Sequence, residues 1–396
     1  MKQWESSNPV GTVPGDALPG APELARRGNI TTGYRELDLV HPGQLDLASG
    51  KQQGLWKHCD RKLTVSVWYP AVASAQDQPA VFTDYMGRID LGNLTPFRLA
   101  SRSLQAPEAD RESGKHPVVV ISHGYPGSRM LLSNLAENLS SKGYVVVSIG
   151  HTDNTYEDFL AQRSMESAWI HRTLDQRFVI LQLSAWNAEG FLKDMLDLEK
   201  VALIGFSMGG YGALRTIGAH VGTEMKEQLK ELAEAVDEPE WHGDPAVKAC
   251  VLFAPAVFWF DPARTEDIRI PTLWFCGTAD KTVRYTSVRS FFESCTNSER
   301  ILVSYTACGH NVANNPAPEC AGNASWEIYK RWADPVWDTN RLNNINVHFV
   351  TAFLDATLFG GTGFRYFEEP LSETPRLGFV DGGDAGVSVL RMHAQD

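Results

Sequence analysis

The feature that most constrains this chain is a serine flanked by small residues, where an expected strand turns into an expected helix. Val201–Ile204 is apolar and mostly branched, as in a buried strand, and Gly205–Gly209 then matches the pattern G-x-S-x-G. A helical pattern follows from Gly212. The serine of such a turn adopts a strained backbone conformation, so small neighbours are needed on both sides. The sequence therefore predicts that Ser207 presents its hydroxyl at the N-terminus of a helix.

Length and charge narrow the class of protein. The chain has 396 residues, of which 43% are hydrophobic, so it can bury a large core. Its net charge of −12 argues against a nucleic-acid partner and against adsorption to an anionic membrane. No apolar run approaches a membrane span, and the N-terminus lacks the apolar core of a secretory signal. We therefore expect a cytoplasmic protein, with a mature secreted form as the alternative; whether it forms a homo-oligomer is left open.

Apolar runs and helical patterns alternate along the chain. This alternation predicts an α/β fold, with a doubly wound, mostly parallel sheet covered by helices on both faces. Between residues 71 and 115 the pattern is irregular, and we expect a surface excursion with a short helix near 99–104. Two early strands are expected at 34–40 and 63–70, buried strands at 116–122, 144–149, 201–204, 249–255, 271–276 and 301–305, and helices at 131–142, near 291–292 and at 345–359.

The expected division of the chain has three parts. Residues 1–30 form an N-terminal arm, 31–365 the α/β domain, and 366–396 a C-terminal tail without a clear period. Within the domain, helical insertions at about 153–200 and 222–244 are expected to form a lid over the site.

A serine hydroxyl becomes a good nucleophile only beside a base that is itself oriented by a carboxylate. In doubly wound hydrolases these partners follow the serine in the order Asp or Glu, then His, at the ends of later strands. Asp280 follows the strand that ends at Cys276, and His310 follows the strand that ends near Tyr305. We assign Ser207 as nucleophile, His310 as general base and then acid, and Asp280 as the carboxylate that holds the imidazole.

Other residues compete for these roles. Asp261 lies just past the preceding strand and is the alternative to Asp280. His123 and His151 also end strands, but both precede Ser207, which is the wrong order for the base. We expect these two histidines to form hydrogen bonds around the site.

The oxyanion formed from the attacked carbonyl needs donors that are already in place. The backbone amide of Met208, directly after the nucleophile, is one candidate. The other lies in the loop 123–128, where we expect the amide of Tyr125, since Pro126 has no N–H. The ring of Tyr125 is also expected to line the substrate pocket.

The pattern indicates neither a metal nor another cofactor. The sequence has no H-E-x-x-H or comparable ligand spacing, and its six cysteines include no C-x-x-C pair. A disulfide between Cys308 and Cys320 is left open.

Five motifs of the sequence carry a resemblance: LTVSVWYPA at 63–71, HGYPGS at 123–128, GFSMGGYGA at 205–213, GTAD at 277–280 and CGHNVANN at 308–315. They resemble the α/β-hydrolase superfamily, and more narrowly the branch of platelet-activating-factor acetylhydrolases, dienelactone-hydrolase-like proteins and cutinase-like polyester hydrolases. The loop 151–155 also resembles the segment that borders the pocket in these enzymes. Two features depart from the branch: dienelactone hydrolases carry a cysteine nucleophile, and secreted polyester hydrolases lack the extra helical material.

The resemblance implies an α/β-hydrolase fold and a carboxylesterase-like serine hydrolase that forms an acyl-enzyme without a cofactor. The substrate is expected to be a small ester with an apolar or aromatic part. The alternatives are an amide or peptide hydrolase with the same triad, and a hydrolase-fold binding protein without activity. The expected substrate contacts are Tyr125, His151, Trp186, Phe258 and Trp259.

Overall fold

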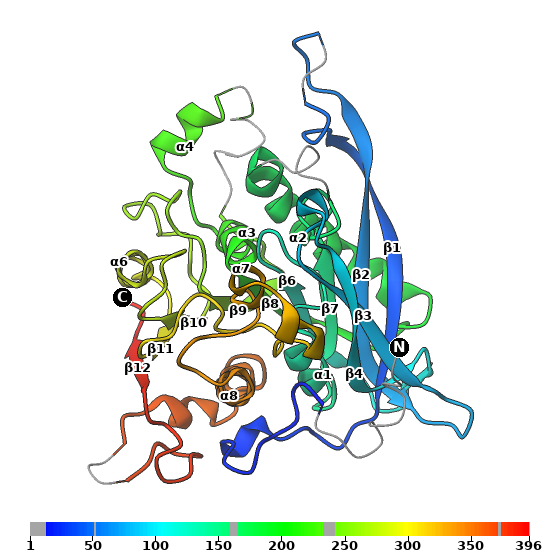
Figure 1. The fold of residues 1–396 in the computed structure, drawn as a ribbon, viewed down its shortest axis with the longest axis vertical. Helices are drawn as coiled ribbons and strands as arrows, with labels where there is room; N and C mark the ends of the chain where they lie inside the picture. The colour runs from blue at the N-terminus through cyan, green and yellow to red at the C-terminus, as the bar shows by residue number, and fades with distance from the viewer. Residues whose placement is uncertain are drawn as a thin grey trace.

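The described residues form one mixed β-sheet with helices on both faces (Figure 1). The computed structural model describes residues 13–50, 53–158, 165–230, 232, 242–370 and 374–395. The strands in this part of the chain are β1 (Thr32–Leu45), β2 (His58–Val72), β3 (Pro79–Met86), β4 (Thr95–Gln105), β5 (Glu108–Ala109), β6 (His116–Ser122), β7 (Val145–Gly150), β8 (Leu196–Phe206), β9 (Val247–Phe253), β10 (Thr272–Gly277), β11 (Arg300–Tyr305) and β12 (Val387–Met392).

The centre of the sheet is parallel. The strand order is β12-β11-β10-β9-β8-β6-β7-β2-β1-β4-β3, with β5 paired to β2, and the six strands from β6 to β11 run parallel to one another. All residues of β6, β7, β10 and β11 are buried, which explains why these strands appear as continuous apolar runs in the sequence. The predicted doubly wound, mostly parallel sheet is confirmed.

The N-terminal side of the sheet is antiparallel except for the parallel pairing of β1 with β4, and it is larger than expected. β1 and β2 pair antiparallel, as predicted, and β2 joins the parallel strands through β7. The surface excursion with a helix near 99–104 is wrong, because residues 79–105 form the antiparallel pair β3 and β4. Phe97 and Leu99 are buried while Arg98 between them is exposed, and this alternation is the period of a strand.

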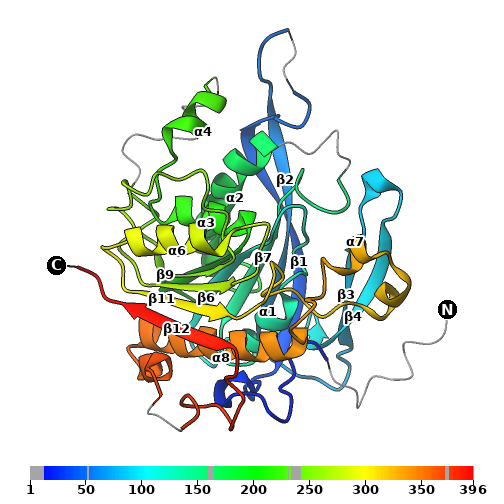
Figure 2. The same ribbon diagram turned by 60° about the vertical axis from the view of Figure 1, so that its left-hand side comes forward.

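Helices cover the two faces of the sheet (Figure 2). α1 (Ser133–Ser140) and α8 (Thr339–Phe359) lie on one face, and α2 (Met165–Ala188), α3 (Met208–Thr216) and α6 (Tyr285–Ser294) lie on the other. The shorter helical elements are η2 (Glu23–Ala25), η3 (Ile89–Leu91), α4 (Thr223–Gln228), η4 (Glu319–Asn323), α7 (Trp326–Tyr329) and η5 (Gly363–Phe367).

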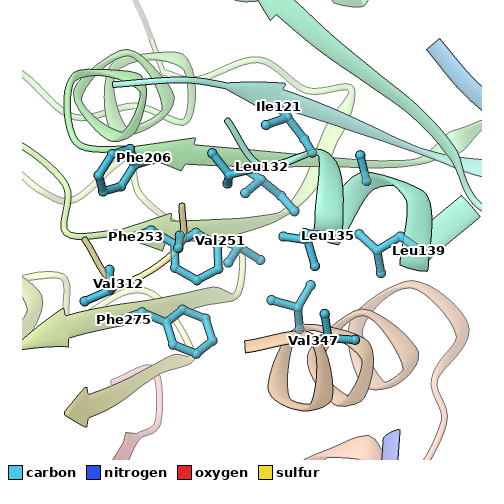
Figure 3. Packing of buried hydrophobic residues seen from close by; sticks show 14 of the residues in the cluster. Ile121, Leu132, Leu135, Leu139, Phe206, Val251, Phe253, Phe275, Val312 and Val347 are labelled. Carbon is cyan, nitrogen blue, oxygen red and sulfur yellow. The ribbon is translucent and has the colours of Figure 1, made fainter. Parts of the chain in front are cut away.

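Two apolar clusters hold these layers together, one on each face. Figure 3 shows the first, where Leu135 and Leu139 of α1 and Val347 of α8 face Ile121 and Val251 of the sheet. All of these side chains are almost completely buried. The strands therefore have rigid support on both sides, and the loops at their carboxyl ends are fixed in place.

The two ends of the described chain are bound to the domain. The backbone amide of Leu18 donates to Asn344 of α8 at 2.9 Å, so the described part of the N-terminal arm lies against that helix. At the other end, β12 pairs antiparallel with β11 along its whole length. The segment 366–396 is therefore not simply a tail, because part of it forms the edge of the sheet.

The two predicted insertions are only partly helical. α2 accounts for much of 153–200, but Leu196–Lys200 already belongs to β8. α4 covers only the start of the second insertion, and residues 231 and 233–241 lie outside the described residues. None of the helices in the described part of the chain is long and apolar enough to cross a membrane. All six cysteines are unpaired, including Cys308 and Cys320.

Candidate active site

Ser207 lies at a sharp turn between β8 and α3. Its φ of 53° and ψ of −114° form a strained conformation for a residue with a side chain. The glycines around it are required by close packing: a Cβ at Gly209 would lie 2.0 Å from the carbonyl oxygen of Ser122, and one at Gly205 would lie 2.4 Å from that of Gly209. The amide of Ser207 donates to the carbonyl of Phe253 at 2.9 Å, which ties the turn to β9.

Three side chains that are distant in the sequence meet at this turn. Ser207 Oγ lies 3.0 Å from His310 Nε2, and His310 Nδ1 lies 2.7 Å from Asp280 Oδ2. Because a carboxylate only accepts, the Nδ1–H of His310 donates to it and Nε2 is left to accept the serine proton. The side chain of Asp280 is 1% exposed and that of His310 is 20% exposed, so the chain of hydrogen bonds runs from the protein interior to an accessible hydroxyl.

Asp280 is held by the loop that follows β10. Its Oδ1 accepts from the amides of Thr282 and Val283 at 2.8 and 3.0 Å, which leaves Oδ2 directed to His310. The alternative carboxylate, Asp261, instead accepts from the amide of Ala263 at 2.9 Å and has no bond to His310. The structure therefore places Asp280, and not Asp261, behind the imidazole.

The loop with the second expected oxyanion donor is held by Arg172 of α2. The guanidinium donates to the carbonyl oxygens of His123 and, at 2.8 Å, Gly124. The C=O and N–H of a trans peptide point in opposite directions, so fixing the Gly124 carbonyl toward Arg172 directs the amide of Tyr125 away from α2. Burial lowers the pKa of Arg172 to about 9. Met208 is the first residue of α3, where backbone amides lack partners within the helix.

A second, fully buried Ser–His–Asp chain lies beneath this loop. Ser122 Oγ is 2.8 Å from His151 Nε2, and His151 Nδ1 is 2.9 Å from Asp175 Oδ2. Arg61 binds both oxygens of Asp175, at 2.9 and 3.1 Å. Burial, and next the charge of Arg172, lower the pKa of His151 to about 3, so this imidazole is neutral.

The expectation that His151 contacts substrate is corrected by this arrangement. His151 is 0% exposed and both of its ring nitrogens are occupied within the protein. His123 is likewise 0% exposed, and its Nε2 accepts from the amide of His151 at 3.2 Å. Both histidines do form hydrogen bonds around the site, as expected of them.

A cavity of about 670 Å³ opens beside Ser207 and His310. Tyr125 lines it, as expected, together with Tyr156 and Phe206. Further lining residues come from the segment between β11 and α8, which includes Trp326 and Asp334. The predicted lid is thus corrected: among the described residues of the two insertions only Tyr156 reaches this cavity, and the segment 307–335 covers it instead.

Three other expected substrate contacts lie elsewhere. Trp259 packs against the rings of Trp169 and Tyr211, at 5.5 and 5.7 Å between centroids, on the α2–α3 face of the sheet. With Phe258 it lines a separate cavity of about 460 Å³ beside α4. Trp186 of α2 packs against the core on the same face. The aromatic run after β9 therefore turns away from Ser207.

One group of side chains outside the site has a composition that could bind a metal. In the described part of the chain, His220, Glu266 and Asp267 have ligand atoms within 4.8 Å of one another. His220 Nε2 already bonds Asp267 at 2.9 Å, and its Nδ1 lies 3.2 Å from the guanidinium of Arg264. Both ring nitrogens of His220 therefore already have partners within the protein, and this residue is not among those that line the cavity at Ser207.

Family models match two overlapping parts of the chain. Residues 91–176 match the family "Platelet-activating factor acetylhydrolase, isoform II", and residues 167–316 match "Serine hydrolase (FSH1)". The second range contains Ser207, Asp280 and His310. Cutinase est1 of Thermobifida alba is 27% identical over 132 residues, and Cutinase 2 of Thermobifida cellulosilytica is 28% identical over 132 residues. These matches span 33% of this chain and 38% and 42% of the two cutinases.

The overall fold matches a solved esterase. A structure of ferulic acid esterase from Streptomyces cinnamoneus aligns with a TM-score of 0.61 and 20% identity, over 94% of this chain and 99% of that one. The chain therefore has the α/β-hydrolase fold. Parts of the chain are thus similar to platelet-activating-factor acetylhydrolases, to serine hydrolases and to cutinases.

Proposed function

We propose that this protein hydrolyses carboxylic esters through an acyl-enzyme formed on Ser207. The observation that carries the proposal is the chain of hydrogen bonds from Ser207 Oγ to His310 Nε2, 3.0 Å, and from His310 Nδ1 to Asp280 Oδ2, 2.7 Å. Matches to serine hydrolase and cutinase families support the same reaction class. The chemistry of this site requires no metal or other cofactor.

In the first half of the reaction, Ser207 Oγ attacks the ester carbonyl while its proton passes to His310 Nε2. The carbonyl oxygen becomes an oxyanion, which the amides of Met208 and Tyr125 stabilise. As the C–O bond to the alcohol breaks, His310 returns the proton to the departing oxygen. Asp280 holds the imidazole in the tautomer that can carry out both transfers.

In the second half, water replaces the alcohol. His310 takes a proton from the water as its oxygen attacks the acyl carbon, and the second oxyanion occupies the same site. The bond to Ser207 Oγ then breaks, the serine recovers its proton, and the acid leaves. His310 is partly exposed and borders the cavity, which gives water a route to this carbon.

The cavity supports a small ester with an apolar or aromatic part as substrate. Tyr125, Tyr156, Phe206 and Trp326 supply aromatic surface around the reacting groups. A volume of about 670 Å³ accommodates a small molecule.

The first experiment combines covalent labelling with burst kinetics. A fluorophosphonate probe should label the folded chain once, at Ser207, as read by peptide mass spectrometry. A chromogenic ester such as 4-nitrophenyl butyrate should give a burst of about one equivalent of phenolate if deacylation is the slower step. Labelling of a different serine, or turnover that persists in Ser207→Ala, would contradict the proposal.

The same experiments separate the two alternatives. An amide or peptide hydrolase should cleave butyryl 4-nitroanilide at a rate comparable with 4-nitrophenyl butyrate, whereas an ester hydrolase should cleave only the ester at an appreciable rate. A hydrolase-fold binding protein should react with neither substrate and should not take up the probe.

A further inference from the structure

The cavity at Ser207 has a charge opposite to that of the molecule. The chain as a whole carries a net charge of −12. The charged side chains that line the cavity are nevertheless three cations, Lys281, Lys330 and Arg331, and one acid, Asp334. The charged side chains of the cavity are therefore mostly opposite in sign to the net charge of the chain.

The acid in the cavity is already used to hold backbone. Asp334 Oδ2 accepts from the amide of Gly309 at 2.7 Å, and Oδ1 accepts from the amides of Val336 and Trp337 at 2.9 and 2.8 Å. Its two oxygens are therefore occupied, and its charge is partly neutralised by these donors.

Two of the three cations are not neutralised by an ion pair. Lys330 pairs with the exposed Glu327 at 2.5 Å. Lys281 and Arg331 have no ion pair within the ranges that the structure describes, and a positive charge there is left to act on whatever enters the cavity.

The backbone beneath these cations is fixed close to His310. Asn314 Nδ2 donates to the carbonyl of Arg331 at 2.9 Å, and Asn311 Nδ2 donates to the carbonyl of Lys330. Asn311 is the residue directly after His310, and Lys281 is the residue directly after Asp280. The cations thus come from two separate segments: Lys281 directly follows Asp280, and the 330–331 backbone is bound to the loop that follows His310.

We propose that the cavity selects esters that carry a separate negative charge, such as half-esters of dicarboxylic acids, over neutral esters of the same size. The proposal rests on the ester hydrolysis proposed for Ser207 and adds a substrate class to it. Lys281 and Arg331 attract the free carboxylate, while Tyr156 and Trp326 contact the apolar part between the carboxylate and the ester. A partly enclosed cavity strengthens such an attraction, because its low-dielectric walls focus the field of the cations.

Two pairs of matched esters test the proposal, one for each side of the ester bond. On the acyl side, 4-nitrophenyl hydrogen adipate is compared with 4-nitrophenyl hexanoate. On the alcohol side, 3-carboxyphenyl butyrate is compared with 3-carbamoylphenyl butyrate. In at least one pair, kcat/KM for the anionic ester should be higher by about tenfold at low salt, and about 0.5 M NaCl should remove most of this preference. The background rate of each ester is measured with Ser207→Ala and subtracted.

Single-charge variants show whether these two cations cause the preference. Lys281→Gln and Arg331→Gln should each lower the ratio of anionic to neutral kcat/KM by about threefold or more. Lys115→Gln is the matched control, because Lys115 is exposed and precedes β6, at the amino ends of the parallel strands, whereas Ser207 follows the carboxyl end of β8. This control should leave the ratio unchanged.

The outcomes separate the two proposals. Hydrolysis of the neutral esters with equal or greater efficiency in both pairs, or a ratio that neither variant changes, would overturn the charge selection and leave ester hydrolysis in place. Failure to hydrolyse any of the four esters, together with failure of the fluorophosphonate probe to label Ser207, would overturn the proposed function itself.

Discussion

The molecule contains two Ser–His–Asp chains with nearly the same hydrogen-bond distances. In Ser122–His151–Asp175 the two bonds measure 2.8 and 2.9 Å, and in Ser207–His310–Asp280 they measure 3.0 and 2.7 Å. Both lie at the carboxyl ends of parallel strands. The distances alone therefore do not distinguish a candidate catalytic site from a structural network.

Three physical differences do distinguish them. The Ser122–His151–Asp175 hydrogen-bond chain is closed to solvent, since Ser122 and His151 are both 0% exposed. Ser207 and His310, in contrast, border the cavity. Ser122 lies within β6, whereas Ser207 has a positive φ that lifts it out of β8. Asp175 is neutralised by Arg61, and the pKa of His151 is lowered to about 3, by burial first and then by Arg172. Solvent access and backbone geometry, rather than hydrogen-bond distance, therefore separate the proposed nucleophile from the buried serine.

The largest expected effect contrasts the two serines. Ser207→Ala should lower kcat by about 10⁴-fold or more, because the nucleophile is lost. Ser122→Ala should keep kcat within about tenfold, since it removes one buried hydrogen bond. Both are measured with 4-nitrophenyl butyrate on protein whose circular dichroism matches that of the parent chain. A comparable loss of kcat in both variants would show that the buried chain takes part in the reaction.

Substitution of Asp280 should mainly lower kcat, whereas substitution of Asp175 should mainly lower stability. Asp280→Asn should lower kcat by about 10³- to 10⁴-fold with little change in stability, because the imidazole loses the partner that fixes its tautomer. Asp175→Asn should instead lower the free energy of unfolding by about 3 kcal/mol, because Arg61 keeps a buried charge beside a neutral amide. Urea unfolding and steady-state kinetics measure the two effects. A reduced kcat with unchanged stability in Asp175→Asn would contradict the structural role given to Asp175.

A smaller effect is expected where the two regions meet, at Arg172. Arg172→Lys should lower kcat by about 10- to 100-fold with little change in KM, because one ammonium cannot hold both carbonyls that direct the amide of Tyr125. Arg26→Lys, at an exposed arginine, serves as the control. A parallel rise in KM, or loss of folding without a specific loss of kcat, would argue that Arg172 stabilises the helix only and does not orient the loop.

The smallest expected effect concerns a buried acid without an arginine pair, in contrast to Asp175. Burial raises the pKa of Asp84 to about 7, and its Oδ2 has no hydrogen-bond partner. Between about pH 4 and pH 7 the native state keeps a proton that the unfolded state has released, so this group makes stability fall as pH rises.

Removal of the charge at this position tests that sign. Asp84→Asn should flatten this part of the stability profile and raise the free energy of unfolding at pH 8 by about 2 kcal/mol. Urea unfolding at pH 5 and pH 8 measures the difference. Equal stability of both proteins at pH 8 would mean that Asp84 is solvated in the native state.

The central part of the fold could be predicted because its signals are local. Each buried parallel strand is one continuous apolar run, and Ser207, Asp280 and His310 each follow such a run directly. The pair β3 and β4 was also visible in principle, because Phe97 and Leu99 alternate with exposed residues. An irregular composition around them favoured a loop instead.

The rest of the site depends on contacts that no local pattern contains. His151 ends a strand as a functional residue would, but its position does not reveal that the ring turns inward to Asp175. The wall of the cavity at 307–335 is held by Asn311 and Asn314, which bond carbonyls of residues 17 or more positions away. Such pairings become visible only once the chain is folded.

The edge strand β12 has a consequence for how the chain is made. β11 ends at Tyr305, yet the strand that covers its outer edge begins only at Val387. During synthesis, β11 therefore emerges from the ribosome with a row of unpaired peptide groups on its outer edge. These groups stay unpaired until the chain through Met392 has been made. A nascent or truncated chain that stops before Val387 would contain every residue of the proposed chemistry, and would still offer an open strand to any neighbouring copy.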